Sequence, residues 1–241
     1  MKTPELSIVI PAFHEADRIG GSLDVLAAYV NSDLFESVEV IVVAADSRDG
    51  TADIARSKRS MFPELRVFEL SRGRGKGADV AYGMERGRGR YRMFMDADLA
   101  TPLHYLYTLK EQMGSDADAI IAVRDLARSH QGLRKMISSL GNAVIRWVLG
   151  ESVPDTQCGF KAFRSDVAET IFPRQTIGGW GFDIELLAIT KQHGYAITTI
   201  PVPDWQDVGG SALGNTPIAA AFSTLRDLVM IKWRMWTRRY E

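Results

Sequence analysis

The strongest constraint on the fold is a regular alternation of short β-branched runs with helical periodicity through the first half of the chain. Strands of a parallel sheet are buried on both faces and appear as short apolar runs, whereas surface helices repeat apolar residues three and four positions apart. The predicted strands are Leu6–Ile10, Val38–Val43, Leu65–Leu70, Tyr91–Met95 and Ala119–Val123, and the predicted helices between them are Ala16–Val30, Thr51–Ser60, Gly77–Arg86 and Thr101–Met113. This alternation predicts an α/β protein with a mainly parallel, three-layer sheet and right-handed crossovers.

The pattern changes after Arg124, where helical and strand signals no longer alternate regularly. The segments predicted there are a helix over Gly132–Leu149, a Gly-rich strand segment at Asp155–Arg164, a helix over Phe182–His193, a strand over Ala196–Pro201 and a helix over Pro217–Trp236. The chain has no internal repeat and no low-complexity linker, so the 241 residues are expected to form one domain.

Composition excludes several classes of protein. The formal net charge of −1 argues against binding to nucleic acid through bulk charge. Cys158 is the only cysteine, which excludes an internal disulfide and a cysteine-built zinc site and favours a reducing compartment. No stretch approaches the roughly 18 uninterrupted apolar residues of a membrane span, so any work at a membrane is expected to be peripheral.

Two carboxylates follow the apolar run at 91–95, in the stretch Met93-Phe94-Met95-Asp96-Ala97-Asp98. Asp96 and Asp98 at a strand end can share one hard cation, which also binds diphosphate oxygens. The alternative is that Asp98 or Thr101 caps the next helix and Asp96 is an ordinary loop acid. Because no basic residue adjoins the pair in the sequence, we favour a metal site.

Glycines and basic residues alternate at 72–77, directly before the helix predicted near Ala78. Glycines permit close backbone approach, a helix amino terminus favours an anion, and Lys76 adds a positive charge. The spacing GxxxxGK[ST] of nucleotide hydrolases is absent. Alone this would be a flexible basic turn, but beside a metal site it favours diphosphate binding.

Two further segments allow two interpretations each. Phe13, in Pro11-Ala12-Phe13-His14-Glu15, either offers an apolar surface to a nucleotide base or belongs to the core. The basic segment after the fifth predicted strand is either a solvated face or a phosphate-binding cluster, in which Arg134 and Ser138 share a helix face.

Taken in order, seven motifs resemble those of the family 2 inverting glycosyltransferases, and more narrowly those of the polyprenyl- and dolichyl-phosphate sugar synthases of the glucosyl type. The motifs are SIVIPAFHE, the DGT that ends VVAADSRDGT, GRGKGADVAYGM, FMDADLAT, DTQCGFKAFR, GWGFDIELL and IPVPDWQDVGGS. The resemblance implies a GT-A fold, a three-layer α/β/α domain with a mainly parallel mixed sheet. It divides the chain into a nucleotide-sugar-binding half (1–124), an acceptor half (125–214) and a C-terminal amphipathic basic helix (215–241).

The resemblance also implies residues that bind the donor. Asp96 and Asp98 match the pair that holds Mg²⁺ or Mn²⁺ on the diphosphate, and Lys76 matches a lysine near the phosphates. The positions that contact the nucleoside correspond to Pro11, Phe13 and Glu15. Relatives usually have DDGSxDGT where this chain has Ala44, Ala45 and Asp46, and one of those acids hydrogen-bonds the base. We therefore expect Asp46 to take over that contact, and Asp49 and Thr51 to cap the following helix.

On the acceptor side, Arg124, Arg134 and Ser138 match positions that grip the phosphate of a lipid acceptor. Asp183 and Glu185 lie in a motif where other members of the family place a catalytic base, although each is equally compatible with a structural role. The implied reaction is a single displacement with inversion, in which the metal and Lys76 stabilise the leaving nucleoside diphosphate. A phosphate acceptor is already ionised and needs no strong base, whereas an alcohol acceptor would need Asp183 or another acid.

The expected activity is therefore metal-dependent transfer of a hexose, glucose before others, from a UDP-sugar in preference to a GDP-sugar, to a polyprenyl or dolichyl phosphate. A homo-oligomer and a cytoplasmic location at the inner face of a membrane are compatible with this activity. The alternatives are a soluble glycosyltransferase with a small-molecule or carrier-bound acceptor, and a non-catalytic nucleotide-sugar-binding protein.

The last predicted helix carries an apolar stripe flanked by basic residues. The stripe comprises Phe222, Leu225, Val229, Trp233, Trp236 and Tyr240, and the flanking residues are Arg226, Lys232, Arg234, Arg238 and Arg239. A basic amphipathic helix with tryptophans can lie in a membrane interface. The alternative is that the stripe packs on the sheet or on a second subunit.

Overall fold

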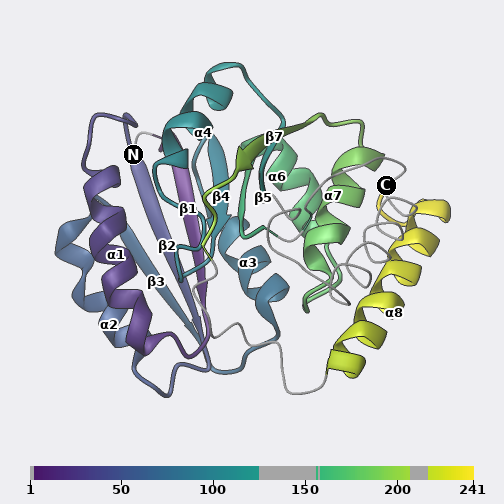
Figure 1. Cartoon of the computed structure of the whole chain (residues 1–241), viewed down its shortest axis with the longest axis horizontal. Helices are drawn as coiled ribbons and strands as arrows, with labels where there is room; N and C mark the ends of the chain where they lie inside the picture. Colours follow the sequence, from purple (N-terminus) through teal and green to yellow (C-terminus); the bar gives the residue numbers. More distant parts are fainter. Residues whose placement is uncertain (1–2, 125–155, 157, 207–216) are drawn as a thin grey trace.

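The computed structural model describes residues 3–124, 156, 158–206 and 217–241, and in this part of the chain a seven-stranded sheet forms the centre of the molecule (Figure 1). Its strand order is β3-β2-β1-β4-β6-β5-β7. The strands are β1 (Leu6–Ala12), β2 (Val38–Ala45), β3 (Leu65–Leu70), β4 (Tyr91–Met95), β5 (Ala119–Arg124), β6 (Phe160–Arg164) and β7 (Ile197–Val202). Only β6 runs antiparallel to its neighbours, β4 and β5. The mainly parallel mixed sheet predicted from the sequence is confirmed.

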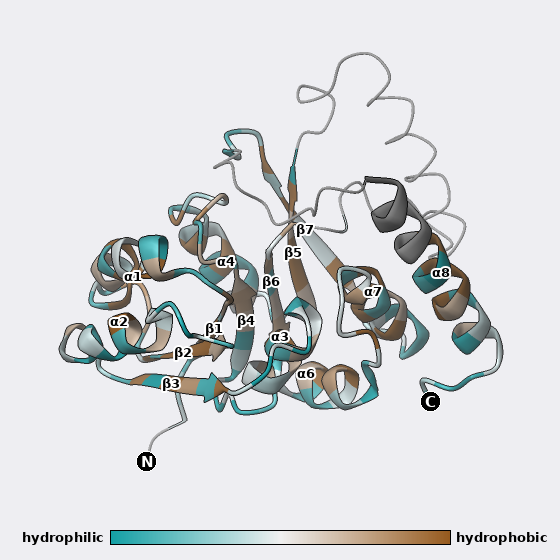
Figure 2. Cartoon of the chain, turned by 90° about the horizontal axis from the view of Figure 1, so that it is seen from below, coloured by the Kyte–Doolittle hydropathy of each residue, from teal (hydrophilic) through white to brown (hydrophobic). Residues whose placement is uncertain are grey.

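Helices cover both faces of this sheet, as Figure 2 shows. The helices are α1 (Ala16–Val30), α2 (Thr51–Ser57), α3 (Lys76–Met84), α4 (Tyr105–Gly114), α6 (Ser165–Ile171), α7 (Phe182–Gln192) and α8 (Pro217–Trp236), with 3₁₀ turns η1 (Arg59–Met61) and η2 (Phe172–Arg174). One apolar core joins the sheet to α1, α2 and α4, and the other joins it to α3, α6, α7 and α8. Alternate residues of each central strand enter opposite cores, which explains their uninterrupted apolar character.

The predicted elements agree with the structure except at particular boundaries. Strand β2 continues through Ala44 and Ala45, and the helix predicted over Thr51–Ser60 ends at Ser57 and is followed by η1. Helix α4 begins at Tyr105, because the stretch after β4 forms an irregular loop through Pro102 before the helix starts. Helix α6 was not predicted. The helix predicted over Gly132–Leu149 lies outside the described residues.

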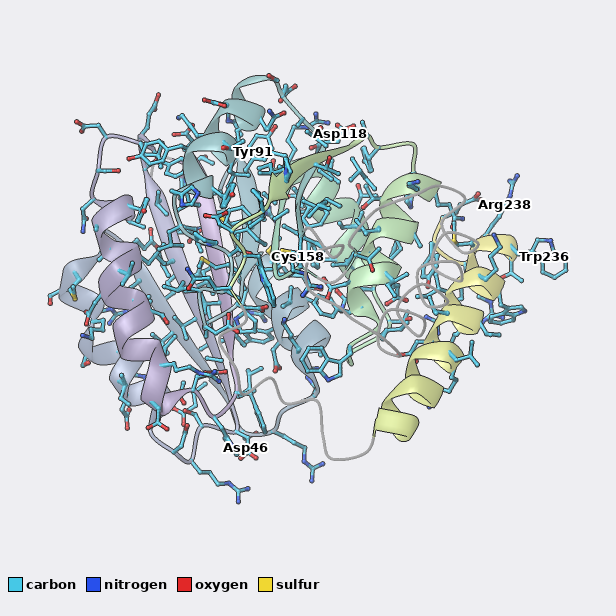
Figure 3. All side chains as sticks on the ribbon, in the orientation of Figure 1. Asp46, Tyr91, Asp118, Cys158, Trp236 and Arg238 are labelled. Atoms are coloured by element: carbon cyan, nitrogen blue, oxygen red, sulfur yellow. The ribbon has the colours of Figure 1, made fainter. Side chains whose placement is uncertain are left out.

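The order of the strands defines where the sheet can bind a ligand. The chain builds β1, β2 and β3 outward in one direction and then returns to place β4 on the other side of β1. In open α/β sheets, ligands bind at such a switch point, in the crevice beyond the carboxyl ends of the strands. Figure 3 shows Asp46, which follows β2, at this end of the sheet, whereas Tyr91 and Asp118 lie at the opposite end.

No helix in the described part of the chain has both the length and the apolar character needed to cross a membrane.

Candidate active site

Asp96 and Asp98 follow β4 at the switch point, and Gly159, which directly precedes β6, leaves space for the Asp96 side chain. A Cβ atom on Gly159 would lie 2.0 Å from Asp96 Oδ2, and the Gly159 carbonyl accepts a hydrogen bond from the Asp96 N–H (3.1 Å). Asp98 Oδ1 accepts the Ala100 N–H (3.0 Å), so this side chain also shapes the loop. Leu99, between Asp98 and Ala100, has a positive φ of 54°. Strained backbone of this kind is concentrated at functional sites.

Lys76 reaches this carboxylate pair from the start of α3. Its Nζ lies 2.5 Å from Asp96 Oδ1. Burial works to lower the pKa of Lys76, but the carboxylates of Asp96, Asp183 and Asp98 outweigh burial and hold that pKa above its usual value. The ammonium group is therefore charged at neutral pH. The metal site was favoured because no basic residue adjoins Asp96 and Asp98 in the sequence. In the folded chain, Lys76 is such a basic residue beside Asp96.

The basic glycine loop before α3 is fixed by backbone contacts with the segment that precedes α7. The N–H groups of Gly77 and Ala78 both donate to the Gly178 carbonyl (2.8 and 3.3 Å). Gly75 has a φ of 98°, and a Cβ atom there would lie 2.4 Å from the same carbonyl. The expectation that the amino terminus of α3 offers free amides to an anion is thus wrong for these two groups. Lys76 supplies the positive charge through its side chain instead.

Glu15 lies beside the carboxylate pair at the end of β1. Burial raises the pKa of Glu15 above its usual value, and the charges of Asp98 and Asp96 raise it further, while Arg18 opposes the shift. Arg18 Nε bonds Glu15 Oε2 at 2.7 Å. The three carboxylates therefore share one electrostatic environment although they come from two different strand ends.

The Asp-Gly-Thr turn after β2 fastens the loop that carries Glu15. Thr51 Oγ1 accepts the Glu15 N–H (2.9 Å), and Asp49 Oδ2 accepts the Ala16 N–H (3.1 Å). Asp49 Oδ1 also accepts the Thr51 N–H (3.1 Å). Asp49 therefore binds the first N–H of α2, and Asp49 and Thr51 both bind the start of α1. The N-cap residue of α2 is Gly50, without a side-chain cap hydrogen bond, and Thr51 is the first helical residue, so the prediction that Thr51 caps this helix is wrong.

The aromatic ring at the end of β1 is open to solvent. Phe13 is 51% exposed and stacks on His14, with ring centroids 4.2 Å apart. The interpretation of Phe13 as a core residue is therefore wrong. Pro11, the preceding site residue, lies in β1 opposite Val43 of β2. His14 has a positive φ of 54°, a second strained position at this edge of the sheet.

Asp46 is also at this edge, with a positive φ of 48° (Figure 3). Its Oδ1 lies 2.9 Å from Arg48 Nε, and the Arg48 side chain is 86% exposed. The Asp46 N–H donates to the Leu70 carbonyl of β3 (2.8 Å). The expected base-reading carboxylate is thus turned toward a neighbouring surface arginine.

Of the three residues predicted to bind the acceptor phosphate, the structure describes Arg124 alone. Arg124 ends β5 with its guanidinium 4.8 Å from the centre of the Trp205 ring. The Gln206 N–H donates to the Ala100 carbonyl (3.0 Å), so the segment after β7 lies against the loop that carries Asp98. Arg134 and Ser138 lie outside the described residues.

Asp183 and Glu185, in the first turn of α7, have different partners. Asp183 Oδ1 lies 2.5 Å from the Nζ atom of Lys161, a side chain with no exposed surface. Burial raises the pKa of Asp183, while Lys161 and Lys76 act to lower it. Glu185 accepts the Ile177 N–H (2.7 Å) and the Tyr240 hydroxyl (2.8 Å). Glu185 therefore joins α7 to the loop before it and to the carboxyl end of the chain, which is a structural role.

Two tryptophans at this site were not identified from the sequence. Lys76 Nζ lies 5.5 Å from the centre of the Trp180 ring, which is 48% exposed. Trp205, described above, holds Arg124. Both tryptophans lie within motifs quoted for the family resemblance, and a tryptophan between Gly179 and Gly181 was the available signal.

The donor groups present fit a divalent cation that is shared with a substrate. The described residues contain no cluster of three or more side chains able to hold a metal by themselves. Mg²⁺ commonly binds through one or two carboxylates together with substrate phosphates. Asp96 and Asp98 form such a pair, and Gly159 leaves the space that the Asp96 carboxylate occupies.

Helix α8 leaves most of its apolar stripe exposed. Leu225, Val229, Trp233 and Trp236 are 49, 58, 45 and 81% exposed, and Figure 3 shows Trp236 projecting away from the molecule. The opposite face, with Leu228 and Ile231, packs in the core. Tyr240, predicted as part of the stripe, is instead buried. The alternative that the stripe packs on the sheet is wrong for the four exposed residues.

Comparisons with known proteins agree with this geometry. A model of the family described as glycosyl transferase family 2 matches residues 7–172. The dolichyl-phosphate beta-glucosyltransferase of Drosophila melanogaster is 32% identical over 251 residues, which are 97% of this chain and 75% of that protein. The enzyme of the same name from Dictyostelium discoideum is 29% identical over 245 residues, 95% of this chain and 74% of that protein.

Solved structures show the same fold. The crystal structure of glucosyl-3-phosphoglycerate synthase from Mycobacterium tuberculosis with Mn²⁺, UDP-glucose and phosphoglyceric acid has a TM-score of 0.66 and 20% identity, covering 96% of this chain and 79% of that one. At that identity the likeness establishes the GT-A architecture alone. Together with the family match over more than half of its length, it shows that the chain belongs to glycosyl transferase family 2 and is a glycosyltransferase with the GT-A fold.

Proposed function

We propose that this enzyme transfers glucose, with inversion, from a nucleoside-diphosphate glucose to a dolichyl or polyprenyl phosphate, and that UDP-glucose is the donor in preference to GDP-glucose. The observation that carries the proposal is the charge cluster at the switch point, where Lys76, Asp96 and Asp98 meet. The names of the similar proteins supply the sugar and the lipid phosphate. The solved neighbours, bound to UDP or UDP-glucose, supply the base.

In this proposal the donor diphosphate lies over the end of β4. Asp96 and Asp98 would hold Mg²⁺ or Mn²⁺, which supplies positive charge against the leaving diphosphate when it is bound. Lys76 neutralises further charge on the phosphates and stays protonated at neutral pH, because its pKa is raised. Phe13, Pro11 and Glu15 line the path from the phosphates toward the end of β2, where the nucleoside would lie.

The acceptor side favours a phosphate over an alcohol. Asp183, the expected base for an alcohol acceptor, is buried and bonded to Lys161. A phosphate monoester needs no proton removed before it attacks, so positioning by cations matters more than a base. Arg124, held by Trp205 at the end of β5, is one such cation, and Arg134 and Ser138 remain proposed phosphate contacts.

The lipid acceptor also gives the exposed face of α8 a role. Trp233 and Trp236 lie on the exposed apolar stripe, and the Arg239 guanidinium lies 4.5 Å from the centre of the Trp233 ring. Tryptophan and arginine side chains together suit the boundary between lipid headgroups and acyl chains. We place this stripe in the interface of the membrane that carries the acceptor, on its cytoplasmic side.

The decisive experiment is a transfer assay with radiolabelled UDP-glucose and GDP-glucose, Mn²⁺ or Mg²⁺, and three acceptors: dolichyl phosphate, polyprenyl phosphate and phosphoglyceric acid. Transfer to either lipid phosphate supports the proposal. Transfer to phosphoglyceric acid alone would instead support a soluble glycosyltransferase. Nucleotide binding without metal-dependent turnover would support a non-catalytic binding protein.

A further inference from the structure

One buried carboxylate near the proposed donor site has an oxygen atom without a hydrogen-bond partner among the described residues. Asp79, in the first turn of α3, is 3% exposed. Its Oδ1 atom is buried and has no hydrogen-bond partner among the residues that the structure describes. Leaving a buried carboxylate unpaired costs free energy of folding, and a buried polar atom left unsatisfied in a native fold is a candidate for a functional role.

The packing of α3 places Asp79 at the carboxyl end of β2. Gly83 lies one turn farther along the same face of α3, and a Cβ atom there would lie 2.4 Å from Val9 Cγ1 and 3.0 Å from Val43 Cγ2. Because α3 connects two parallel strands, it runs opposite to them. One helical turn of about 5.4 Å spans nearly two strand residues of about 3.3 Å each. Asp79 is therefore level with Ala45, which shares the face of Val43.

A neighbouring aromatic contact fixes which flank of α3 carries Asp79. Tyr82, on the same flank, meets Phe68 of β3 edge to face, with ring centroids 5.6 Å apart. Ala45 is itself paired with Leu70 of β3. The Asp79 carboxylate is thus directed to the ends of β2 and β3, on the opposite side of β1 from the carboxylate pair that follows β4.

Small residues connect this position to the exposed aromatic ring of the site. A Cβ atom on Gly73 would lie 3.9 Å from Ala45 Cβ and 3.3 Å from Phe13 Cε2. Ala45 is fully buried and carries only a methyl group, so it does not extend across the strand end. Asp46, the acid expected to read the base, is turned toward Arg48. Glu15, the other carboxylate near this edge, is bonded to Arg18, whereas Asp79 Oδ1 has no hydrogen-bond partner among the described residues.

We propose that Asp79 reads the nucleoside of the donor by accepting a hydrogen bond from an N–H group of the base, the role that the sequence assigned to Asp46. The proposal deepens the proposed function and rests on it. The group read would be N3–H of uracil, or N1–H of guanine if the donor is a GDP-sugar. Both N–H groups can donate a hydrogen bond to a carboxylate. A site that binds through a hydrogen bond to a charged group discriminates strongly against a ligand without the donor.

The electrostatic state of Asp79 agrees with this role. Burial raises the pKa of Asp79 to about 6, against a lowering effect of Arg74. The group is therefore mostly ionised at pH 7.5 and gains from a donor that a ligand supplies. Arg74 precedes α3 in the exposed loop and is the cation whose charge acts on Asp79.

The test measures how strongly the protein distinguishes a nucleotide from its N-methylated analogue. Calorimetry with Mn²⁺ would compare UDP with N3-methyl-UDP, and GDP with N1-methyl-GDP, for the wild type, Asp79→Ala, Asp46→Ala and Asp53→Ala. Asp53 is a matched control because it lies in the first turn of α2 and is exposed. We expect methylation to weaken wild-type binding about 10- to 100-fold, the range for a hydrogen bond to a charged group.

The variants separate the inference from the function on which it rests. Asp79→Ala is expected to bind the parent nucleotide and its methylated analogue equally, whereas Asp46→Ala and Asp53→Ala keep the wild-type ratio. A wild-type ratio in Asp79→Ala, or its loss in Asp46→Ala, would overturn the inference while leaving the proposed function intact. Failure of the wild type to bind either parent nucleotide would overturn the proposed function itself. Circular dichroism of each variant confirms that a lost ratio does not reflect unfolding.

Discussion

Lys76 and Asp96 form an ion pair that joins the start of α3 to the end of β4, with Nζ 2.5 Å from Oδ1. The Lys76 ammonium group, proposed to bind the donor phosphates, is thus paired with Asp96, a carboxylate proposed to bind the metal. A bound metal diphosphate would therefore exchange partners with both groups, the carboxylate turning to the cation and the ammonium to the phosphates. Glycines allow the close contacts around both groups: Gly159 lies against the Asp96 carboxylate, and Gly75, directly before Lys76, lies against the Gly178 carbonyl.

Lys76→Met is expected to lower kcat for glucose transfer about 100-fold, because removing one preorganised group from developing charge has effects of that order. KM for the donor should change less, since the metal still binds the diphosphate. Lys76→Arg keeps the charge and should recover part of the rate. Steady-state kinetics of the three proteins check this, and a Lys76→Met enzyme with wild-type kcat would contradict the role.

Asp98→Asn is expected to abolish metal-dependent stabilisation without unfolding the protein. The asparagine oxygen can still accept the Ala100 N–H, so the loop keeps its internal hydrogen bond. In wild type, Mn²⁺ with UDP should raise Tm by mass action, and EDTA should reverse the rise. The measurement is Tm of both proteins with and without Mn²⁺ and UDP. An equal rise in the variant would exclude Asp98 as a metal ligand.

The fold was predictable from the sequence because each strand carries its own local signal. Four elements have the bounds predicted for them: the strands Leu65–Leu70 and Tyr91–Met95 and the helices Ala16–Val30 and Pro217–Trp236. Helix α6 was missed because it is only seven residues long and begins at Ser165, immediately after β6, so the strand signal masks its start.

The site was predictable only where a motif occupies one strand end. Asp96, Asp98 and Lys76 converge as the resemblance implied, because parallel strands bring their carboxyl ends to one edge. The partners of Asp183 and Asp46 were not predictable, since Lys161 comes from β6 and the positive φ of Asp46 turns its side chain. Asp79 carried no sequence signal at all, because only the packing of α3 reveals that it is buried with one oxygen unpartnered by the residues that the structure describes.

Asp183→Asn is expected to destabilise the protein by about 3–5 kcal/mol, the effect of leaving a buried charge without its partner. The uncompensated charge is that of Lys161, which has no exposed surface. The double variant Asp183→Asn/Lys161→Met should recover much of this stability, because it removes both charges. Chemical denaturation of the single and double variants measures the difference, and an unchanged midpoint in Asp183→Asn would contradict a structural ion pair.

The same variants test the acceptor chemistry. Per folded molecule, Asp183→Asn is expected to lose less transfer activity with dolichyl phosphate than Arg134→Ala, since an ionised phosphate acceptor needs positioning rather than a base. Rates must be normalised to the folded fraction at the assay temperature. The opposite ranking would contradict the proposal that the acceptor is a lipid phosphate and would favour an alcohol acceptor.

Trp233→Ser/Trp236→Ser is expected to reduce binding to anionic liposomes at least tenfold while leaving Tm unchanged, because both side chains are exposed and belong to neither apolar core of the described residues. Tyr107→Ser is a matched control, since Tyr107 is 54% exposed on α4. Flotation with vesicles of phosphatidylcholine and phosphatidylserine measures the partitioning. Equal flotation of the double variant and the wild type would remove α8 from the membrane contact.

Asp79→Asn is expected to raise the free energy of unfolding at pH 7.5 and to raise it by less at pH 5, where about half of the penalty for the ionised carboxylate has developed. The pKa of Asp79 is about 6 in the folded protein, above the usual value of about 3.9 for an unfolded chain. The folded state therefore binds the proton more tightly, and stability falls as pH rises from about 4 to 6, after which the penalty is complete. A shift of two units corresponds to at most about 3 kcal/mol, from which the desolvation of the asparagine amide is subtracted.

Denaturation midpoints at the two pH values, with Asp53→Asn as the control, measure this difference. Saturating nucleotide should reduce the stability gain of Asp79→Asn over the wild type, because only the carboxylate gains a charged hydrogen bond from the base. A gain that is equal at both pH values would mean that Asp79 is not an unpaired buried acid. A loss at both would mean that Asp79 stabilises the fold, and the energetic argument for its role in reading the base would then fail.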